Sequence, residues 1–420
     1  MKATPRSERL HIGVFGKCNS GKSTLINALC GQETSLVSDI PGTTTDPVMK
    51  NIEIPGVGAA TLIDTPGIDD SSVLGAARVR RTMDTVRKCD IAIITVSAPD
   101  YSYTNGLEDV NQKETQDSNG SEAELISMFA KSGLPYIIVL SKCDLTDGKE
   151  KIAARLYEKF GKHPVMTDSG GYGSLTEALA QTAESIAGGQ RSITAGLVEE
   201  GDVVILVIPQ DSEAPKGRII MPQNAVIREL MEKKCTAVCT VPEQLGKALS
   251  LLSSPPSLVI TDSQAFRTVA GILPQDIRLT SFSILFAAYK GNIDTFLKGA
   301  EAIDSLKEGS KVLIAEACSH VPAGEDIGRI KIPAMLRKRI GSGLEINFVS
   351  GNDFPENLSG YDLVIHCGAC MFNRRYVLSR ISQAEEQNIP ITNYGIAIAR
   401  LTGILPRTCI PNADENVKQY

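Results

Sequence analysis

The sequence predicts an α/β protein in which a larger first domain is followed by two smaller α/β domains with mainly parallel sheets. Apolar runs of strand length alternate along the chain with segments whose apolar residues recur at helical spacing. At 420 residues the chain is too long for one hydrophobic core. A polar, glycine-rich stretch separates the first domain from the rest. We expect domains at 1–188, 189–275 and 276–420.

Composition excludes several classes of protein. Hydrophobic residues make up 42% and charged residues 22% of the chain, as in globular proteins. The longest apolar runs are much shorter than the ~20 residues of a membrane span, and the N-terminus lacks an apolar signal segment, so we expect a cytoplasmic protein. The net charge of −6 disfavours a broad nucleic-acid surface. The ten cysteines are then expected to be thiols or metal ligands.

The first domain opens with a phosphate-binding motif. The apolar strand HIGVFG leads into GKCNSGKS and then into the helical TLINALCG. In such a motif, glycines let backbone N–H groups surround phosphate oxygens at a helix N-terminus. Lys22 is expected to contact the β and γ phosphates and to act in catalysis, and Ser23 to bind magnesium. The nucleotide-binding residues predicted in this loop are Gly16, Asn19, Ser20, Gly21, Lys22, Ser23 and Thr24.

Two further segments predict the rest of the phosphate and magnesium site. TLIDTPG places Asp64 at the end of a second apolar strand, where it can hold magnesium through water, and Gly67 can sense the γ phosphate. Between the motifs lies PGTTTDP, in which any of three threonines could complete the magnesium shell. Thr44 is the preferred ligand and a catalytic candidate.

A third apolar strand ends at PYIIVLSKCD and predicts the base-binding residues Ser141, Lys142 and Asp144. A carboxylate at Asp144 can accept N1–H and the 2-amino group of guanine, which adenine does not present. Residues 10 to about 175 therefore resemble the translation-factor-class GTPases that include the Era and TrmE families. Those families usually carry Asn where this chain has Ser141, and a serine is too short for the same paired contacts to base and phosphate loop. We therefore expect weaker guanine binding.

The resemblance also bears on hydrolysis. Ile68 stands where Ras-like proteins place a water-orienting glutamine, so intrinsic hydrolysis is expected to be slow. In TrmE-like relatives, an asparagine that matches Asn19 coordinates potassium in place of an arginine finger. The resemblance thus implies a GTPase that uses Mg²⁺ and is stimulated by K⁺, with Asn19 among its catalytic residues.

The middle of the chain shows alternating strands and helices without a cluster of nucleophile, base and acid. VVILVIP reads as a buried strand, and the pattern that follows indicates a small parallel sheet. Such a sheet with an open edge is plausible as an oligomerisation module.

Two strands of the last third end in sulfur and imidazole groups. KVLIAEACSHVP and YDLVIHCGAC have the same form, and parallel strands bring their carboxyl ends to one edge of a sheet. The predicted metal ligands are Cys318, His320, His366, Cys367 and Cys370. Four of them would suffice for a structural zinc site, whereas three thiolates suit a 4Fe–4S cluster with one iron left open. Redox chemistry of the C-x-x-C pair is a third alternative.

The whole chain resembles the maturation GTPases of FeFe-hydrogenase. The resemblance depends on three features in order: a GTPase domain, the segments APKGR and IIMPQ in the middle of the chain, and C-x-H followed by H-C-x-x-C near the end. The resemblance implies a 4Fe–4S cluster on Cys318, Cys367 and Cys370. His320 and His366 would be a labile fourth ligand or hydrogen-bonding support.

The same resemblance implies a scaffold on which two radical enzymes build a diiron precursor that passes to apo-hydrogenase. GTP hydrolysis would serve partner exchange, and the middle domain would form a homodimer or higher oligomer. Two alternatives stay open: a GTPase acting on tRNA or ribosomes with a structural zinc domain, and a GTPase regulated by a Cys367–Cys370 disulfide.

Overall fold

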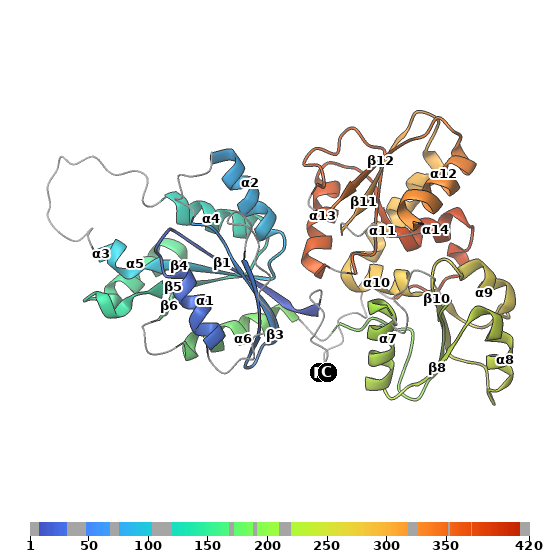
Figure 1. Cartoon of the computed structure of the whole chain (residues 1–420), viewed down its shortest axis with the longest axis horizontal. Coiled ribbons are helices and arrows are strands. Elements are labelled where there is room, and N and C mark those ends of the chain that lie inside the picture. The colour runs from blue at the N-terminus through green and yellow to red at the C-terminus, as the bar shows by residue number, and fades with distance from the viewer. Residues whose placement is uncertain are drawn as a thin grey trace. The chain divides into compact units, whose positions relative to one another are not determined.

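A computed structural model describes most of the chain and separates it into two compact units, Met1–Gly188 and Gly189–Tyr420. The described residues are 8–31, 48–67, 75–102, 120–167, 172–187, 191–209, 220–317, 326–351, 353–370 and 372–411. Each unit has hydrophobic cores of its own. Figure 1 shows the helices and strands that form the units. The predicted α/β class, with its mainly parallel sheets, is confirmed.

The first unit is built on a six-stranded sheet of order β2-β3-β1-β4-β5-β6. Its strands are β1 (Leu10–Gly16), β2 (Val48–Ile54), β3 (Gly58–Asp64), β4 (Ile91–Ser97), β5 (Tyr136–Ser141) and β6 (Val165–Met166). Every pairing is parallel except that of β2 with β3. Because β1 and β4 are buried on both faces, they read as continuous apolar runs, as central parallel strands do.

Helices pack on both faces of this sheet. One core joins the sheet to α1 (Lys22–Gly31) and α6 (Gly173–Ala187). The other core joins it to α2 (Gly75–Val86), α4 (Gly120–Lys131) and α5 (Lys149–Phe160), with the short α3 (Ala98–Ser102) following β4. The strand-to-helix turn from β1 to α1 therefore lies at the carboxyl edge of a parallel sheet, where ligands bind in such folds.

The second unit begins with a four-stranded parallel sheet of order β10-β9-β7-β8. Its elements are β7 (Val203–Val207), α7 (Met221–Glu232), β8 (Thr236–Thr240), α8 (Leu245–Ser250), β9 (Leu258–Thr261), α9 (Phe266–Ile272), β10 (Leu279–Ser281) and α10 (Phe282–Lys290). The boundary expected between 275 and 276 precedes β10, which pairs with β9. Leu279 also forms an isolated parallel bridge with Thr408, so a C-terminal segment lies against β10.

A second parallel sheet, of order β12-β11-β13-β14, follows in the same unit. Its elements are α11 (Ile293–Glu301), β11 (Lys311–Glu316), α12 (Ile332–Ile340), β12 (Glu345–Ser350), β13 (Leu363–His366), α13 (Arg374–Glu386), β14 (Ile391–Asn393) and α14 (Tyr394–Leu401). One core runs from α10 through α14, so α10 packs with the second sheet as well. β11 and β13 are neighbours, with Ala315 opposite His366.

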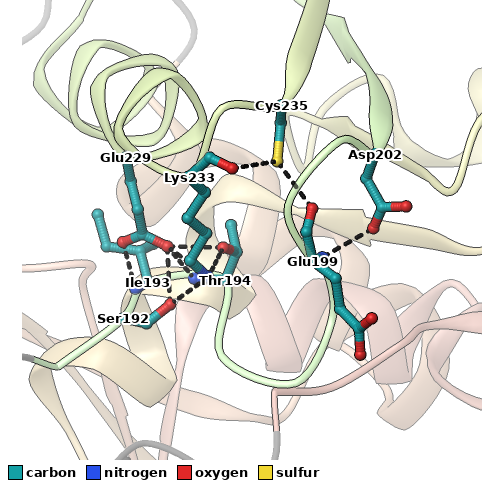
Figure 2. A network of polar contacts seen from close by, with 8 residues as sticks. All are labelled: Ser192, Ile193, Thr194, Glu199, Asp202, Glu229, Lys233 and Cys235. Carbon is teal, nitrogen blue, oxygen red and sulfur yellow. Dashed lines mark hydrogen bonds and ion pairs between the residues drawn. The ribbon is translucent and has the colours of Figure 1, made fainter. Parts of the chain in front are cut away.

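A polar network fixes the start of the second unit to α7 (Figure 2). The carboxylate of Glu229 accepts hydrogen bonds from the backbone N–H of Ile193 and Thr194 at 2.5 and 2.9 Å. The hydroxyls of Ser192 and Thr194 donate to the same carboxylate at 2.8 and 2.6 Å. Segment 192–194 is thus anchored on a helix more than thirty residues later in the chain.

None of the helices in the described ranges is both long and apolar enough to span a bilayer.

Candidate functional site

The phosphate loop runs from the end of β1 at Gly16 to the start of α1 at Lys22. The Lys22 side chain is buried, and its ammonium donates to the carbonyl oxygens of Gly16 at 3.1 Å and Lys17 at 2.6 Å. Ser23 and Thr24 are exposed in the first turn of the helix. Backbone N–H groups of that first turn lack partners within the helix, so the loop offers both donors and a cation to phosphate.

Two positions in the loop require its particular residues. Gly16 has φ +147°, and a Cβ there would lie 2.4 Å from Thr95 Oγ1 and 2.6 Å from Ser20 Oγ. These two hydroxyls are hydrogen-bonded at 2.6 Å, and this contact attaches the loop to β4. Asn19 is exposed with φ 59°, in the left-handed region that asparagine tolerates better than most residues. The asparagine expected to hold potassium therefore lies at the exposed bend of the loop.

The second motif lies beside this loop. Asp64 ends β3. The pKa of its carboxyl is raised, because the effect of burial exceeds the opposing effect of the charges on Lys22 and Lys50. Gly67 packs closely on the loop, since a Cβ there would lie 2.3 Å from Cys18 Sγ and 2.8 Å from the Cys18 backbone nitrogen. The structure thus brings Lys22, Asp64 and Gly67 together. Thr44 and Ile68 lie outside the described residues.

The base-binding segment is attached to the phosphate loop through Ser141. Its hydroxyl lies 2.7 Å from the carbonyl oxygen of Ser20 and 3.1 Å from that of Val96 and donates to them. Lys142 follows with φ 56°, and the Asp144 side chain is exposed in the next turn. Although the sequence indicated that a serine is too short for both contacts, Ser141 does reach the phosphate loop.

The second candidate site lies at the carboxyl ends of β11 and β13. The backbone N–H of Ala317 donates to Cys367 Sγ at 3.0 Å, and that of Ala369 donates to the same sulfur at 3.4 Å. Ala317 is the last described residue before Cys318 in the sequence. Cys318 and His320 themselves lie outside the described residues. Within the described ranges, no three His, Cys, Asp or Glu side chains are grouped to hold a metal.

His366 is buried behind Cys367 with both ring nitrogens in contact with the protein. Its Nε2 lies 2.9 Å from Arg380 Nη1, and because a guanidinium only donates, Nε2 must accept. Nδ1 then carries the hydrogen and donates to the carbonyl oxygen of Cys367 at 2.6 Å. Burial, followed by the charge of Arg380, lowers the pKa of His366 to about 3. Of the two roles that the resemblance implies, this arrangement favours hydrogen-bonding support.

The turn that begins at Cys367 and includes Cys370 is surrounded by three residues that sequence reasoning missed: Lys290, Arg380 and Tyr394. Arg380 is buried on α13 and donates to Tyr376 Oη at 2.6 Å as well as to His366. The Tyr394 hydroxyl is buried with no hydrogen-bond partner among the described residues. Burial and the charge of Cys367 raise the pKa of Tyr394. Nothing in the local sequence distinguishes these residues from ordinary helix residues.

Three family models match the chain in succession. Residues 11–142 match the model described as a 50S ribosome-binding GTPase. Residues 193–291 match the hydrogen maturase F dimerization domain, and residues 294–411 match the hydrogen maturase F tetramerization domain. The last two models adjoin each other and together span more than half of the chain.

The curated relatives that match the chain include GTPases of two kinds. GTPase Der from Kosmotoga olearia is 34% identical over 149 residues, covering 34% of this chain and 30% of the relative. The tRNA modification GTPase MnmE from Acidiphilium cryptum is 41% identical over 104 residues, covering 24% of each chain. The chain thus spans less than a third of the length of these two relatives.

Solved structures give a more distant likeness. The G domain of the T. maritima FeoB iron transporter has 21% identity and a TM-score of 0.29, covering 43% of this chain and 99% of that domain. Era from Aquifex aeolicus has 16% identity and a TM-score of 0.31, covering 58% of this chain and 98% of that one.

The matches agree with the geometry of the two sites. The GTPase model covers β1, α1, β3 and β5, which carry the phosphate loop, Asp64 and Ser141. The hydrogen maturase F models cover both sheets of the second unit, including the turn with Cys367 and Cys370. The chain therefore belongs to the hydrogen maturase F family.

Proposed function

We propose that this chain is a GTP-hydrolysing scaffold that holds a 4Fe–4S cluster and assembles and delivers a diiron precursor to apo FeFe-hydrogenase. Its partners would be two radical-enzyme maturases and the apo-hydrogenase, and it would act in the cytoplasm as a homodimer or higher oligomer. The observation that carries the proposal is the sulfur of Cys367, which accepts hydrogen bonds from the backbone N–H groups of Ala317 and Ala369. Ala317 directly precedes Cys318 in the sequence, and the same chain has a phosphate loop.

The proposed hydrolysis depends on charge placed at the phosphate loop. Lys22, held at the centre of the loop, would contact the transferred phosphoryl group as negative charge develops on it. Magnesium, held by Ser23, Thr44 and Asp64, would supply further neutralisation of the phosphates. Asp144 would select guanine. Asn19, exposed at the bend of the loop, would hold a potassium ion.

Potassium dependence tests the role of Asn19. Turnover is measured as phosphate release in potassium and in sodium salts at equal ionic strength. We expect faster turnover in potassium, and we expect Asn19→Ala to remove the difference. Equal rates of the unsubstituted protein in both salts would refute the potassium proposal and leave the GTPase proposal intact.

Two features of the described residues support the proposed sulfur-liganded iron centre. N–H groups directed at a cysteine sulfur stabilise a thiolate, the form that binds iron, and hydrogen bonds to sulfur also tune cluster potential. The buried Tyr394 hydroxyl has no partner among the described residues and lies within electrostatic reach of Cys367. We propose Cys318, Cys367 and Cys370 as the cysteine ligands and His366 as support for the turn, with His320 as the candidate for the open iron.

Paramagnetic resonance of the reduced protein after anaerobic reconstitution tests the cluster. The matched control for Cys367→Ser is Cys239→Ser, which removes an exposed thiol on β8. We expect the cluster signal to be lost with Cys367→Ser and kept with Cys239→Ser. An unchanged signal in Cys367→Ser would show that the ligand set is wrong.

A second candidate function has some support in the comparisons. One family model is described as ribosome-binding, and relatives of the chain include tRNA modification GTPases. The alternative is a tRNA- or ribosome-associated GTPase with a structural zinc site at the same cysteines. Stoichiometric zinc in the purified protein, together with salt-sensitive RNA binding, would favour this alternative over the scaffold.

A further inference from the structure

Lys290 is a buried cation that contacts the turn carrying the proposed cysteine ligands. It ends α10, and only 4% of its surface is exposed. Its ammonium donates to the carbonyl oxygens of Ala369 at 3.2 Å, Cys370 at 3.3 Å and Phe372 at 2.8 Å. An ammonium has three donors in a compact group. Here at least three acceptors come from one short turn, about eighty residues later in the chain.

A buried ammonium is costly unless hydrogen bonds offset the loss of water. The turn it contacts is itself unfavourable on its own, because Ala369 has φ 47°, in the left-handed region where a Cβ is strained. Three carbonyl dipoles that point to one place also repel one another. The lysine and the turn therefore stabilise each other, and the backbone of Cys370 is one of the points of contact.

Other cations surround the same turn. Arg374 Nη2 donates to the carbonyl oxygen of Gly291, the residue after Lys290, at 3.3 Å. Burial, followed by the charge of Arg191, lowers the pKa of Arg374 to about 10, so it stays charged at neutral pH. Arg380, which lies further along α13 than Arg374, contacts His366. Glu316, the buried carboxylate at the end of β11, is neutralised by Arg329 at 2.9 Å.

We propose that Lys290 is a positioning residue for the metal-ligand turn: its ammonium fixes the carbonyl groups of Ala369, Cys370 and Phe372 and so places the Cys370 sulfur. The same charge offsets the negative charge of a thiolate-bound centre. The electrostatic role rests on the proposed function. The positioning role concerns the metal-free chain and is independent of the proposed function.

Thiol alkylation of the metal-free protein tests the positioning role. Lys290→Met keeps the length of the side chain and removes its charge and donors. The matched control is Lys298→Met, which changes an exposed lysine on α11. Alkylation rates by iodoacetamide are measured for each cysteine by peptide mass spectrometry. We expect the Cys370 rate to rise about tenfold in Lys290→Met, because charged hydrogen bonds to the turn are lost, and to stay unchanged in Lys298→Met.

Cys235 and Cys409 serve as internal references, because both are partly buried thiols of the same unit. If Lys290→Met unfolds the protein, the alkylation rates of Cys235 and Cys409 rise as well. In that case the test is repeated with Lys290→Gln, which keeps two N–H donors in a neutral side chain. A Cys370 rate that does not rise relative to both references in the folded variant would overturn the positioning role.

The midpoint potential of the reconstituted cluster tests the electrostatic role. A positive charge favours the reduced, more negative state, so Lys290→Met is expected to lower the potential relative to the unsubstituted protein, while Lys290→Arg and Lys298→Met keep it nearly unchanged. An unchanged potential in Lys290→Met would refute this role. Failure of every variant, including the unsubstituted protein, to form a cluster would refute the proposed function, and the alkylation result would still decide the positioning role.

Discussion

At the scale of single residues, Ser141 shows how a departure from a family pattern is accommodated. The hydroxyl is buried and donates to the carbonyl oxygens of Ser20 and Val96, so it retains the link between the base-binding segment and the phosphate loop. An asparagine at this position is longer, and its amide can contact the base as well as the loop. The Ser141 hydroxyl thus contacts the phosphate loop at Ser20 and β4 at Val96.

We therefore predict opposite effects of two substitutions on GDP affinity. Ser141→Asn is expected to tighten binding, while Ser141→Ala is expected to weaken it by about 1 kcal/mol because the loop loses a hydrogen bond. Calorimetric titration measures both, with Ser185→Ala, an exposed hydroxyl on α6, as the control. No change or a loss of affinity in Ser141→Asn would contradict the prediction.

The hydroxyl of Tyr394 gives a prediction of stability. It is buried without a hydrogen-bond partner among the described residues, and Gly328 packs against it so tightly that a Cβ would lie 2.1 Å from the oxygen. Removing an unsatisfied buried group is neutral or stabilising, by up to about 1 kcal/mol. Tyr394→Phe is therefore expected to leave the metal-free protein at least as stable in urea. A clear loss of stability would mean that the hydroxyl has a partner.

Among the elements, α7 holds the segment that enters the second unit through the Glu229 carboxylate, with Lys233 also donating to the hydroxyls of Ser192 and Thr194. Glu229 accepts four hydrogen bonds from residues 192–194, and Lys233 lies 3.4 Å from it (Figure 2). Ile193, in the middle of this segment, packs into the core formed with β7 and α7. Loss of the carboxylate would leave several of these donors without a partner.

Glu229→Ala is accordingly expected to lower the free energy of unfolding of the second unit by about 2–4 kcal/mol. The matched control on the same helix is Glu232→Ala. Glu232 pairs with Arg228 at the surface, where the two side chains are 57% and 76% exposed, and such pairs contribute below about 0.5 kcal/mol. Urea denaturation compares the two variants. Similar losses in both would contradict the importance given to Glu229.

The elements were more predictable than the contacts between them. Alternating strands and helices are local patterns, so the parallel sheets and the strand-to-helix turn at Gly16 could be predicted from the sequence. Lys290 and Arg380 could not, because their partners lie far away in the chain or depend on burial. Lys290 ends an apolar helix, a place where a lysine is ordinarily solvated, and only the packing of α10 against the turn gives it a role.

At the scale of the whole molecule, the nucleotide and cysteine sites belong to separate compact units. Each hydrophobic cluster of the described residues lies within one unit. The phosphate loop contacts Thr95 on β4 and Gly67, which follows β3. The segment from His366 to Phe372 contacts Ala317, Lys290 on α10 and Arg380 on α13. Neither site needs side chains of the other unit for the contacts described above.

This separation predicts that each site can be removed without loss of the other. Lys22→Ala is expected to lower GTP turnover by about a hundredfold or more, because the cation at the phosphates is lost, and to leave the reconstituted cluster signal intact. Cys367→Ser is expected to remove the cluster signal and to leave turnover without partners within about twofold, since its surroundings contribute nothing to the phosphate loop. Phosphate release and paramagnetic resonance are measured on the same preparations of the full chain. Loss of turnover in Cys367→Ser, with the phosphate loop still binding GDP, would contradict the separation and show that the cysteine site acts on the nucleotide site.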